Sequence, residues 1–176
     1  MLGKVFTALT VAAVCLSAQG VRITWVGQSC FVIETGEGKP VVITDPPVAS
    51  VGYALPTIEA DVVTVSHNHT DHNNTAGVRG SFTLVDGRTS ASRRQMTAAG
   101  LNFTLIPGFH DNQNGAVRGA NTMVRWTQGG LEIAHLGDHG QDRLTEEQAA
   151  DLRNLDILIL PAGGFFTIDA AGAARL

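Results

Sequence analysis

The sequence is poor in the residues that mark several common protein classes. It has two cysteines, Cys15 and Cys30, and 12 lysines and arginines against 16 aspartates and glutamates in 176 residues. Its formal net charge is −4, and its longest basic run is Arg93-Arg94. We therefore expect no nucleic-acid partner, because such proteins carry a clustered basic surface.

The sequence also lacks an apolar run long enough for a membrane-spanning helix, which needs about 20 residues. The longest, Val5 to Ala18, follows a lone Lys4 and precedes small residues, as in a secretory signal peptide. We predict that residues 1–20 are a signal peptide, cleaved after Gly20 or after Ala18. The protein is then exported, periplasmic or secreted, and of bacterial origin. A lipid anchor on Cys15 is the weaker alternative, because Val14 is a poor residue before a lipidated cysteine.

Cleavage would leave Cys30 without a partner for an intrachain disulfide. Its setting, "SCFVIET", is typical of a strand, so we expect a buried structural thiol rather than a nucleophile. Apolar residues make up 44% of the chain and charged residues 16%, which is ordinary for a globular domain. We predict one domain over residues 21–176.

From Val21 onward, short apolar runs alternate with glycine-rich turns, which predicts a protein built mainly of strands. The first three runs predict a meander with two hairpin connections. Strands are predicted over residues 21–26, 30–35, 41–46, 60–66, 81–87 and 101–108, in a hairpin over 121–138 that turns at Gly129-Gly130, and over 155–161. The β-branched run at 60–66 and the run at 155–161 are expected to be buried.

Three helices are predicted among these strands. One covers residues 92–100 and is closed by Gly100. The second begins at Thr145, which forms a capping box with Gln148. The third opens within residues 167–176. Clusters of strands covered by a few helices indicate a layered α/β or α+β sandwich.

The stretch "TVSHNHTDHNN", residues 64–74, holds three of the six histidines in the chain. It follows a predicted strand, and two other metal-type side chains, His110 and Asp138, also follow strands. Such side chains converge where strands end and their loops meet. In an extended segment His67 and His69 point the same way and can bind one ion, which leaves Asp71 and His72 for a second.

These residues resemble the HxHxDH signature of the metallo-β-lactamase superfamily, followed in order by a later His and a later "GD". The resemblance extends through "ITWVGQSCFVIET", "VVITDP", "GFHDNQNGAVRGAN", "IAHLGDHG", "LTEEQ" and "LILPAGGFFTID". Within the superfamily these segments are similar to the branch of L-ascorbate-6-phosphate lactonase-like and N-acylphosphatidylethanolamine phospholipase D-like hydrolases. The fold that this resemblance implies is an αββα sandwich.

The resemblance also implies a site with two divalent cations, zinc first, with manganese or iron as alternatives. The first cation would be held by His67, His69 and His110. The second would be held by Asp71, His72 and Asp138, with Asp138 bridging both ions and Asp71 also orienting the nucleophile. Asp45, in "TDP", would be the carboxylate that orients a ligand histidine.

One ligand of the superfamily has no counterpart. Its members usually place a last histidine for the second metal on a strand beyond the final helix, and this sequence ends at Leu176 within that helix. We therefore expect the sandwich to be incomplete at its C-terminus. His139 could substitute for the absent ligand, although the family does not use that position.

Other readings remain open for single residues. Asp138 could be an ordinary turn residue, and His135 and Asp111 are interpreted as structural or supporting residues. For the whole protein we expect a hydrolase in which a metal-bound hydroxide attacks an ester, lactone or phosphodiester bond of a small-molecule or lipid-like substrate. The alternative is a non-catalytic or vestigial metal-binding protein with an incomplete second site.

Overall fold

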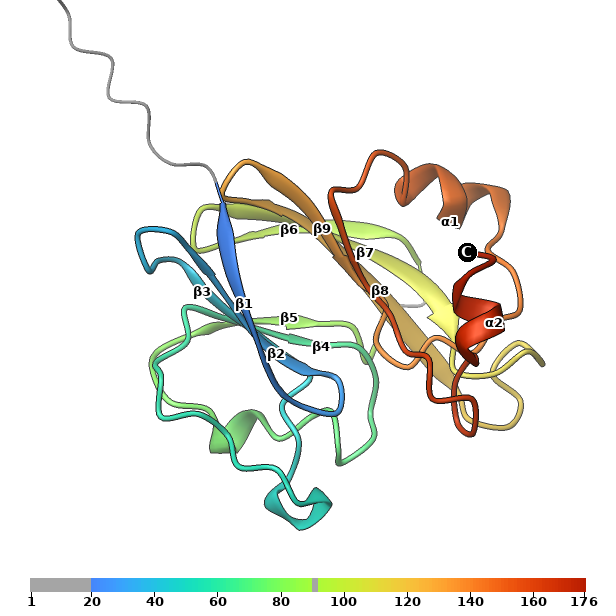
Figure 1. Cartoon of the computed structure of the whole chain (residues 1–176), viewed down its shortest axis with the longest axis horizontal. Coiled ribbons are helices and arrows are strands. Elements are labelled where there is room, and N and C mark those ends of the chain that lie inside the picture. Colours follow the sequence, from blue (N-terminus) through green and yellow to red (C-terminus); the bar gives the residue numbers. More distant parts are fainter. Residues whose placement is uncertain (1–19, 90–91) are drawn as a thin grey trace, which may run out of the picture.

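Two five-stranded sheets packed face to face form the protein (Figure 1). The computed structural model describes residues 20–89 and 92–176, so Cys15 and the predicted signal peptide before Gly20 lie outside the described residues. The first sheet has the order β1-β2-β3-β4-β5 and the second β10-β9-β8-β7-β6. The first consists of β1 (Val21–Gly27), β2 (Cys30–Thr35), β3 (Val41–Thr44), β4 (Val62–Val65) and β5 (Thr83–Asp86).

The first sheet is mixed. Strands β1, β2 and β3 form the predicted antiparallel meander, and β3, β4 and β5 then run parallel to one another. Every residue of β3 and β4 is buried. The sequence predicts this for β4, whose β-branched run is typical of a strand covered on both faces, and β3 beside it is covered in the same way. Parallel neighbours end at the same edge, so the loops that follow β3 and β4 leave the sheet side by side.

The second sheet is also mixed, with four antiparallel strands and a parallel strand at its edge. The predicted hairpin at 121–138 is confirmed, since Gly129 and Gly130 turn the chain with positive φ angles of 58° and 78°. The strands of this sheet are β6 (Arg94–Ala98), β7 (Leu101–Phe109), β8 (Ala120–Gln128), β9 (Leu131–His135) and β10 (Ile157–Ile159).

The predicted helix over residues 92–100 is wrong, because this segment contains strand β6. Ala98 pairs with Leu101 in an antiparallel hairpin, which leaves Ala99 and Gly100 as a two-residue turn. Their φ angles are 48° and 77°, as a primed hairpin turn requires. The glycine interpreted as a helix end is therefore the second residue of a turn, and pairing with β7 outweighs the weak local helix pattern.

The main core lies between the sheets. Apolar side chains from the inner faces of both pack there, among them Ile33, Val62, Phe103 and Trp126. A second cluster, with Cys30 and Val63, lies on the outer face of the first sheet, where loop residues such as Leu55 cover it. A third cluster, around Ile106 and Met123, lies on the outer face of the second sheet.

The helices are short and belong to the second sheet (Figure 1). Helix α1 (Glu146–Asp151) begins with the predicted capping box, and leucines that flank it pack against the third cluster. Helix α2 (Ala170–Ala173) follows Asp169, whose side chain accepts a hydrogen bond from Gly172 N. Over the first sheet there are two single 3₁₀ turns, η1 (Ala49–Val51) and η2 (Thr75–Gly77).

The layered sandwich that the sequence predicts is confirmed, with one difference at its edge. Strand β10 was expected to be buried, but Leu158 is 40% exposed, because β9 is its partner on one side and no described strand pairs with the other. Within residues 20–89 and 92–176, no helix has the length and apolar character needed to cross a membrane.

Candidate metal centre

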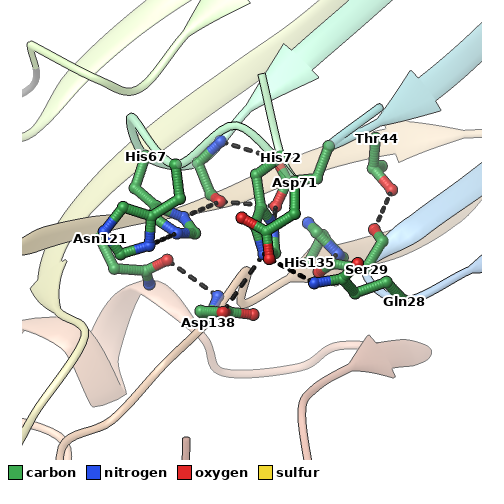
Figure 2. Close-up of polar contacts among 12 residues, drawn as sticks. Gln28, Ser29, Thr44, His67, Asp71, His72, Asn121, His135 and Asp138 are labelled. Carbon is green, nitrogen blue, oxygen red and sulfur yellow. Dashed lines mark hydrogen bonds and ion pairs between the residues drawn. The ribbon is translucent and has the colours of Figure 1, made fainter. Parts of the chain in front are cut away.

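All the residues predicted to take part in the metal site lie together at one edge of the sandwich. Figure 2 shows four of them, His67, Asp71, His72 and Asp138, close to one another. Asp45 directly follows β3, and the loop from His67 to His72 follows β4. His110 directly follows β7, and Asp138 follows β9 after two further residues. Four strand ends, two from each sheet, therefore deliver the cluster.

Three imidazoles form the first half of the cluster. One ligand nitrogen each from His67, His69 and His110 lies within 4.8 Å of the others. The Nε2 atom of His67 is 3.0 Å from Nδ1 of His69, and the His67 and His110 rings stand edge to face with centroids 4.9 Å apart. Three imidazoles converging in this way match the donors that zinc and similar cations bind.

The second half of the cluster is acidic and centres on Asp138. Its Oδ2 atom lies 3.1 Å from His110 Nε2 and 3.2 Å from His72 Nε2, so one carboxylate oxygen reaches both halves. Asp71 Oδ2 lies 3.6 Å from the same nitrogen of His72. One oxygen of Asp138 is therefore placed against both histidines, which a role in the turn alone does not explain.

Asp45 holds the histidine loop in place through hydrogen bonds to Ser66 and a contact with His72. Its carboxylate is fully buried and accepts hydrogen bonds from the backbone N–H of Ser66, at 2.7 Å, and from the Ser66 hydroxyl. Its Oδ2 also lies 3.1 Å from His72 Nδ1, which leaves His72 Nε2 facing the cluster. Ser66 Oγ in turn lies 2.9 Å from His67 Nδ1, so Asp45 orients both histidines.

Asp138 is positioned by a tight turn. Gly137 has a φ of 54°, and a Cβ atom there would lie 2.5 Å from both Asn121 Oδ1 and Ser66 Cβ. Asn121 accepts a hydrogen bond from Asp138 N at 2.9 Å and donates one to Leu136 O at 2.9 Å (Figure 2). Glycine is required here both for its backbone conformation and for the close approach of the loop after β4.

The protonation states of the cluster suit a cation. Burial, with His72 nearby, lowers the pKa of His67 to about 4, and burial also lowers the pKa of His69. Burial alone would raise the pKa of Asp138, but its contacts with His110 and His72 hold it well below its usual range. Neutral imidazoles and ionised carboxylates are the forms that bind metal ions.

His72 lies between two carboxylates, Asp45 and Asp138. Burial lowers its pKa, yet its contacts with Asp138 and Asp45 outweigh burial and raise the pKa to about 10. The two carboxylates therefore favour positive charge at this position, and a bound cation would supply that charge in place of the imidazole proton. The residues present thus fit divalent cations in their chemistry.

The remaining histidines do not belong to this cluster. His135 is buried behind it, with Nε2 3.1 Å from the Ser29 hydroxyl, in line with a supporting role. His139 is buried and belongs to neither group of converging ligand atoms in the described part of the chain. Asp111 is a loop residue, and Cys30 is buried as predicted.

Sequence reasoning missed three residues that shape the site. Gln28 donates a hydrogen bond from its side chain to Asp71, Ser66 joins Asp45 to His67, and Asn121 holds the turn that carries Asp138. All three lie in the stretches that carry the metal motif or the family resemblance, but polar residues in loops are too common for their type to reveal a role.

The cluster faces a cavity of about 340 Å³ that is lined by His69, Asp71, His110 and Asp138, and by Gln28, Val117, Arg118 and Phe166. A second cavity of about 380 Å³ shares Gln28, Asp138 and Phe166 with it and continues along Phe31, Leu160 and Phe165. Phe165 and Phe166 are 78% and 61% exposed. Asp138 thus lines both cavities, of which the first also holds the other ionisable side chains His69, Asp71, His110 and Arg118.

Comparison with known proteins identifies the family of this chain. The profile of the Beta-lactamase superfamily domain matches residues 22–176. A UPF0173 metal-dependent hydrolase from Methanosphaerula palustris is 30% identical over 174 residues, which cover 86% of this chain and 75% of the relative. Another, from Methanoculleus marisnigri, is 28% identical over 176 residues, with 88% and 75% covered. A relative from Anaeromyxobacter dehalogenans also matches, so both archaea and bacteria are represented and bacterial origin stays a prediction.

Solved structures show the same fold. A Thermotoga maritima protein, assigned as a Zn-dependent hydrolase of the metallo-β-lactamase superfamily, matches with a TM-score of 0.69 and 30% identity over 89% of this chain and 69% of that one. A protein from Parabacteroides distasonis, at 19% identity, shares the fold with a TM-score of 0.68 over 88% and 76% of the two chains. The predicted superfamily is therefore confirmed: this chain belongs to the metallo-β-lactamase superfamily, among relatives named metal-dependent hydrolases.

Proposed function

We propose that this metal-dependent hydrolase binds two divalent cations and cleaves an ester, lactone or phosphodiester bond of a small-molecule or lipid-like substrate. The observation that carries the proposal is the position of Asp138 Oδ2, 3.1 Å from His110 Nε2 and 3.2 Å from His72 Nε2. A carboxylate placed between two groups of ligand side chains is suited to a pair of cations sharing one bridging ligand.

In this proposal His67, His69 and His110 hold one cation and Asp71, His72 and Asp138 hold the other. Zinc fits the mixed imidazole and carboxylate donors, and manganese or iron are alternatives. Two such ions would supply water of lowered pKa as the nucleophile and would stabilise charge on the substrate oxygen.

The side chains of the protein orient these groups. Asp45 holds His72 with its Nε2 atom toward the cluster, and Ser66 does the same for the Nε2 atom of His67. Gln28 donates to Asp71 and leaves the rest of that carboxylate free to face the cavity. Asp71 is then the group that orients the attacking water and accepts its proton. The largely apolar cavity beside Asp138 would exclude water from the apolar part of the substrate.

The test combines metal analysis with turnover. We expect about two equivalents of zinc or manganese in the purified protein. We also expect hydrolysis of p-nitrophenyl butyrate or bis-p-nitrophenyl phosphate that a chelator abolishes and added metal restores. Asp138→Asn should lose metal and turnover, whereas Asp142→Asn, an exposed carboxylate outside the cluster, should retain both. One equivalent or none, without turnover, would overturn the proposal in favour of a non-catalytic metal-binding protein.

We also propose, on the leader-like residues 1–20 alone, that the protein is exported. Fractionation of cells that express the full chain, with sequencing of the mature N-terminus, tests this. Retention of Met1 in the cytoplasmic fraction would refute it.

A further inference from the structure

The cavity in front of the metal cluster is lined by one positively charged side chain that takes no part in the proposed metal binding. Arg118 lines it together with His69, Asp71, His110 and Asp138. Among the described residues that line this cavity, Arg118 is the only lysine or arginine. Its guanidinium group stays charged at every physiological pH. In a protein with a net charge of −4, a lone guanidinium beside the reaction centre calls for an explanation.

The guanidinium group of Arg118 is poorly satisfied by the protein itself. Within the described residues it forms no ion pair with a carboxylate. Its contacts are a long hydrogen bond to Phe165 O, at 3.5 Å, and the face of the Phe166 ring, 5.4 Å from the centroid. Arginine has five N–H donors, arranged to bind a carboxylate or a phosphate through two parallel hydrogen bonds. Most of these donors remain available to a ligand.

The backbone of Arg118 is nevertheless held in place. Asp111 accepts hydrogen bonds from four backbone N–H groups of one loop, including Arg118 N at 2.7 Å and Val117 N at 3.0 Å. The same loop begins at His110, whose N–H donates to Gly119 O at 3.0 Å. Arg118 is thus fixed in the loop that carries a proposed metal ligand. A rigid backbone of this kind holds a recognition residue at a constant distance from a reaction centre.

We propose that Arg118 binds an anionic group of the substrate, a carboxylate or a phosphate, beside the bond that is cleaved. This rests on the proposed hydrolase function and adds to it the charge of the substrate. The uncleaved anionic group lies against Arg118 and Phe166, and the scissile bond lies at Asp138. The apolar part of the substrate extends past Asp138 into the cavity lined by Phe31, Leu160 and Phe165.

The test uses three p-nitrophenyl esters of similar length that differ in their far end. They are the neutral butyrate, the glutarate monoester with a carboxylate, and the 4-phosphonobutyrate with a phosphonate. The metal-loaded wild type should prefer one or both anionic esters, and comparison of the two shows which anion the site takes. Arg118→Met should raise KM for the preferred ester about 10- to 100-fold, as expected for loss of a charge-assisted hydrogen bond.

The controls separate recognition from structure. Arg118→Met should leave metal content and unfolding temperature unchanged, and Arg118→Lys should restore part of the preference. Arg153→Met removes an exposed arginine that lines neither cavity, so it should not alter the preference. Equal loss of turnover for all three esters in Arg118→Met, or no preference in the wild type, would overturn the proposal.

A binding measurement keeps this result separate from the hydrolase proposal. Equilibrium dialysis with the hydrolysis-resistant anilides of butyrate, glutarate and 4-phosphonobutyrate reports recognition without turnover. If the wild type cleaves none of the esters but binds an anionic anilide about tenfold more tightly than the neutral one in an Arg118-dependent way, Arg118 recognition stands and ester hydrolysis fails. Equal binding of all three anilides would reject the role of Arg118.

Discussion

Asp45 shows how much one buried side chain can contribute to this site without facing the substrate. Burial alone would raise its pKa, but the contact with His72 and the hydrogen bonds from Ser66 keep the carboxyl ionised, with a pKa below its ordinary value. It adopts a positive φ of 37°, which turns the chain at the end of β3 so that the carboxylate lies under the histidine loop.

Replacing Asp45 with Asn should therefore weaken metal binding. We expect a 10- to 100-fold loss of affinity, roughly the effect of removing a carboxylate that orients a ligand histidine. Competition with a chromophoric chelator measures it. Asp86→Asn is the matched control, because Asp86 also ends a strand of the first sheet but binds Arg88 away from the cluster. Equal affinities in both variants would mean that Asp45 does not support the metal.

Cys30 is a second residue whose behaviour follows from burial. Burial, with a smaller effect from Asp45, raises the pKa of its thiol to about 12. At about pH 8.5, where an unperturbed thiol is half ionised, the native protein should leave Cys30 unmodified by iodoacetamide, as judged by mass spectrometry of its peptide. The urea-unfolded protein should react. Rapid labelling of the native protein would contradict the buried thiol.

The same shift has a consequence for stability, with a definite sign. A group whose pKa is raised by folding stabilises fully below its unfolded pKa and less as the pH rises toward its folded pKa. The free energy of unfolding of the wild type should thus fall relative to Cys30→Ala between about pH 8 and about pH 10. Urea denaturation of both proteins at the two pH values measures the difference, and a constant difference would refute the shift.

At the scale of elements, the β6–β7 hairpin shows that strand pairing determines the structure of a segment whose local sequence only weakly favours a helix. Ala99 occupies the first turn position with a φ of 48°, a conformation that Asn tolerates better than Ala. Ala99→Asn should raise the free energy of unfolding by about 0.5–1 kcal/mol. Ala150→Asn, at an exposed position of α1, should lower it by about 0.5 kcal/mol instead. Urea denaturation measures both changes. Destabilisation by Ala99→Asn would favour the helix that the sequence alone suggests.

At the scale of the molecule, the metal cluster joins the two sheets. His67, His69 and His72 follow a strand of the first sheet, and His110 and Asp138 follow strands of the second. A cation bound between them would add to the apolar core and to the hydrogen bonds between the sheets, such as Thr122 N–H to Ser66 O and Gln128 Nε2 to Ile33 O. Metal binding is therefore expected to stabilise the whole sandwich, not only its loops.

Metal removal should accordingly lower the unfolding temperature. At a free metal concentration of about 1,000 times Kd, binding contributes about 4 kcal/mol, which corresponds to a shift of about 10 °C for a chain of this size. Differential scanning calorimetry with and without chelator measures the shift. His67→Ala should melt at the same temperature in both conditions. A wild type insensitive to chelator would argue against metal binding by this cluster.

Much of the fold can be read from local patterns. The valine-rich strands β3 and β4, the Gly129-Gly130 turn and the Thr145–Gln148 capping box depend on neighbours within a few residues, and all three agree with the structure. Strand β6 and the exposed edge of β10 depend instead on pairing partners. Their local sequences are compatible with more than one structure.

The site divides in the same way. The spacing of His67, His69, Asp71 and His72 is local, so the sequence by itself marked this loop as a metal-binding candidate. Only the tertiary structure decided that Asp138 contacts both His72 and His110, that His139 stays outside the cluster, and that Arg118 lines the same cavity. The physical reason is that these contacts arise from the packing of one sheet on the other, which brings together residues that are distant in sequence.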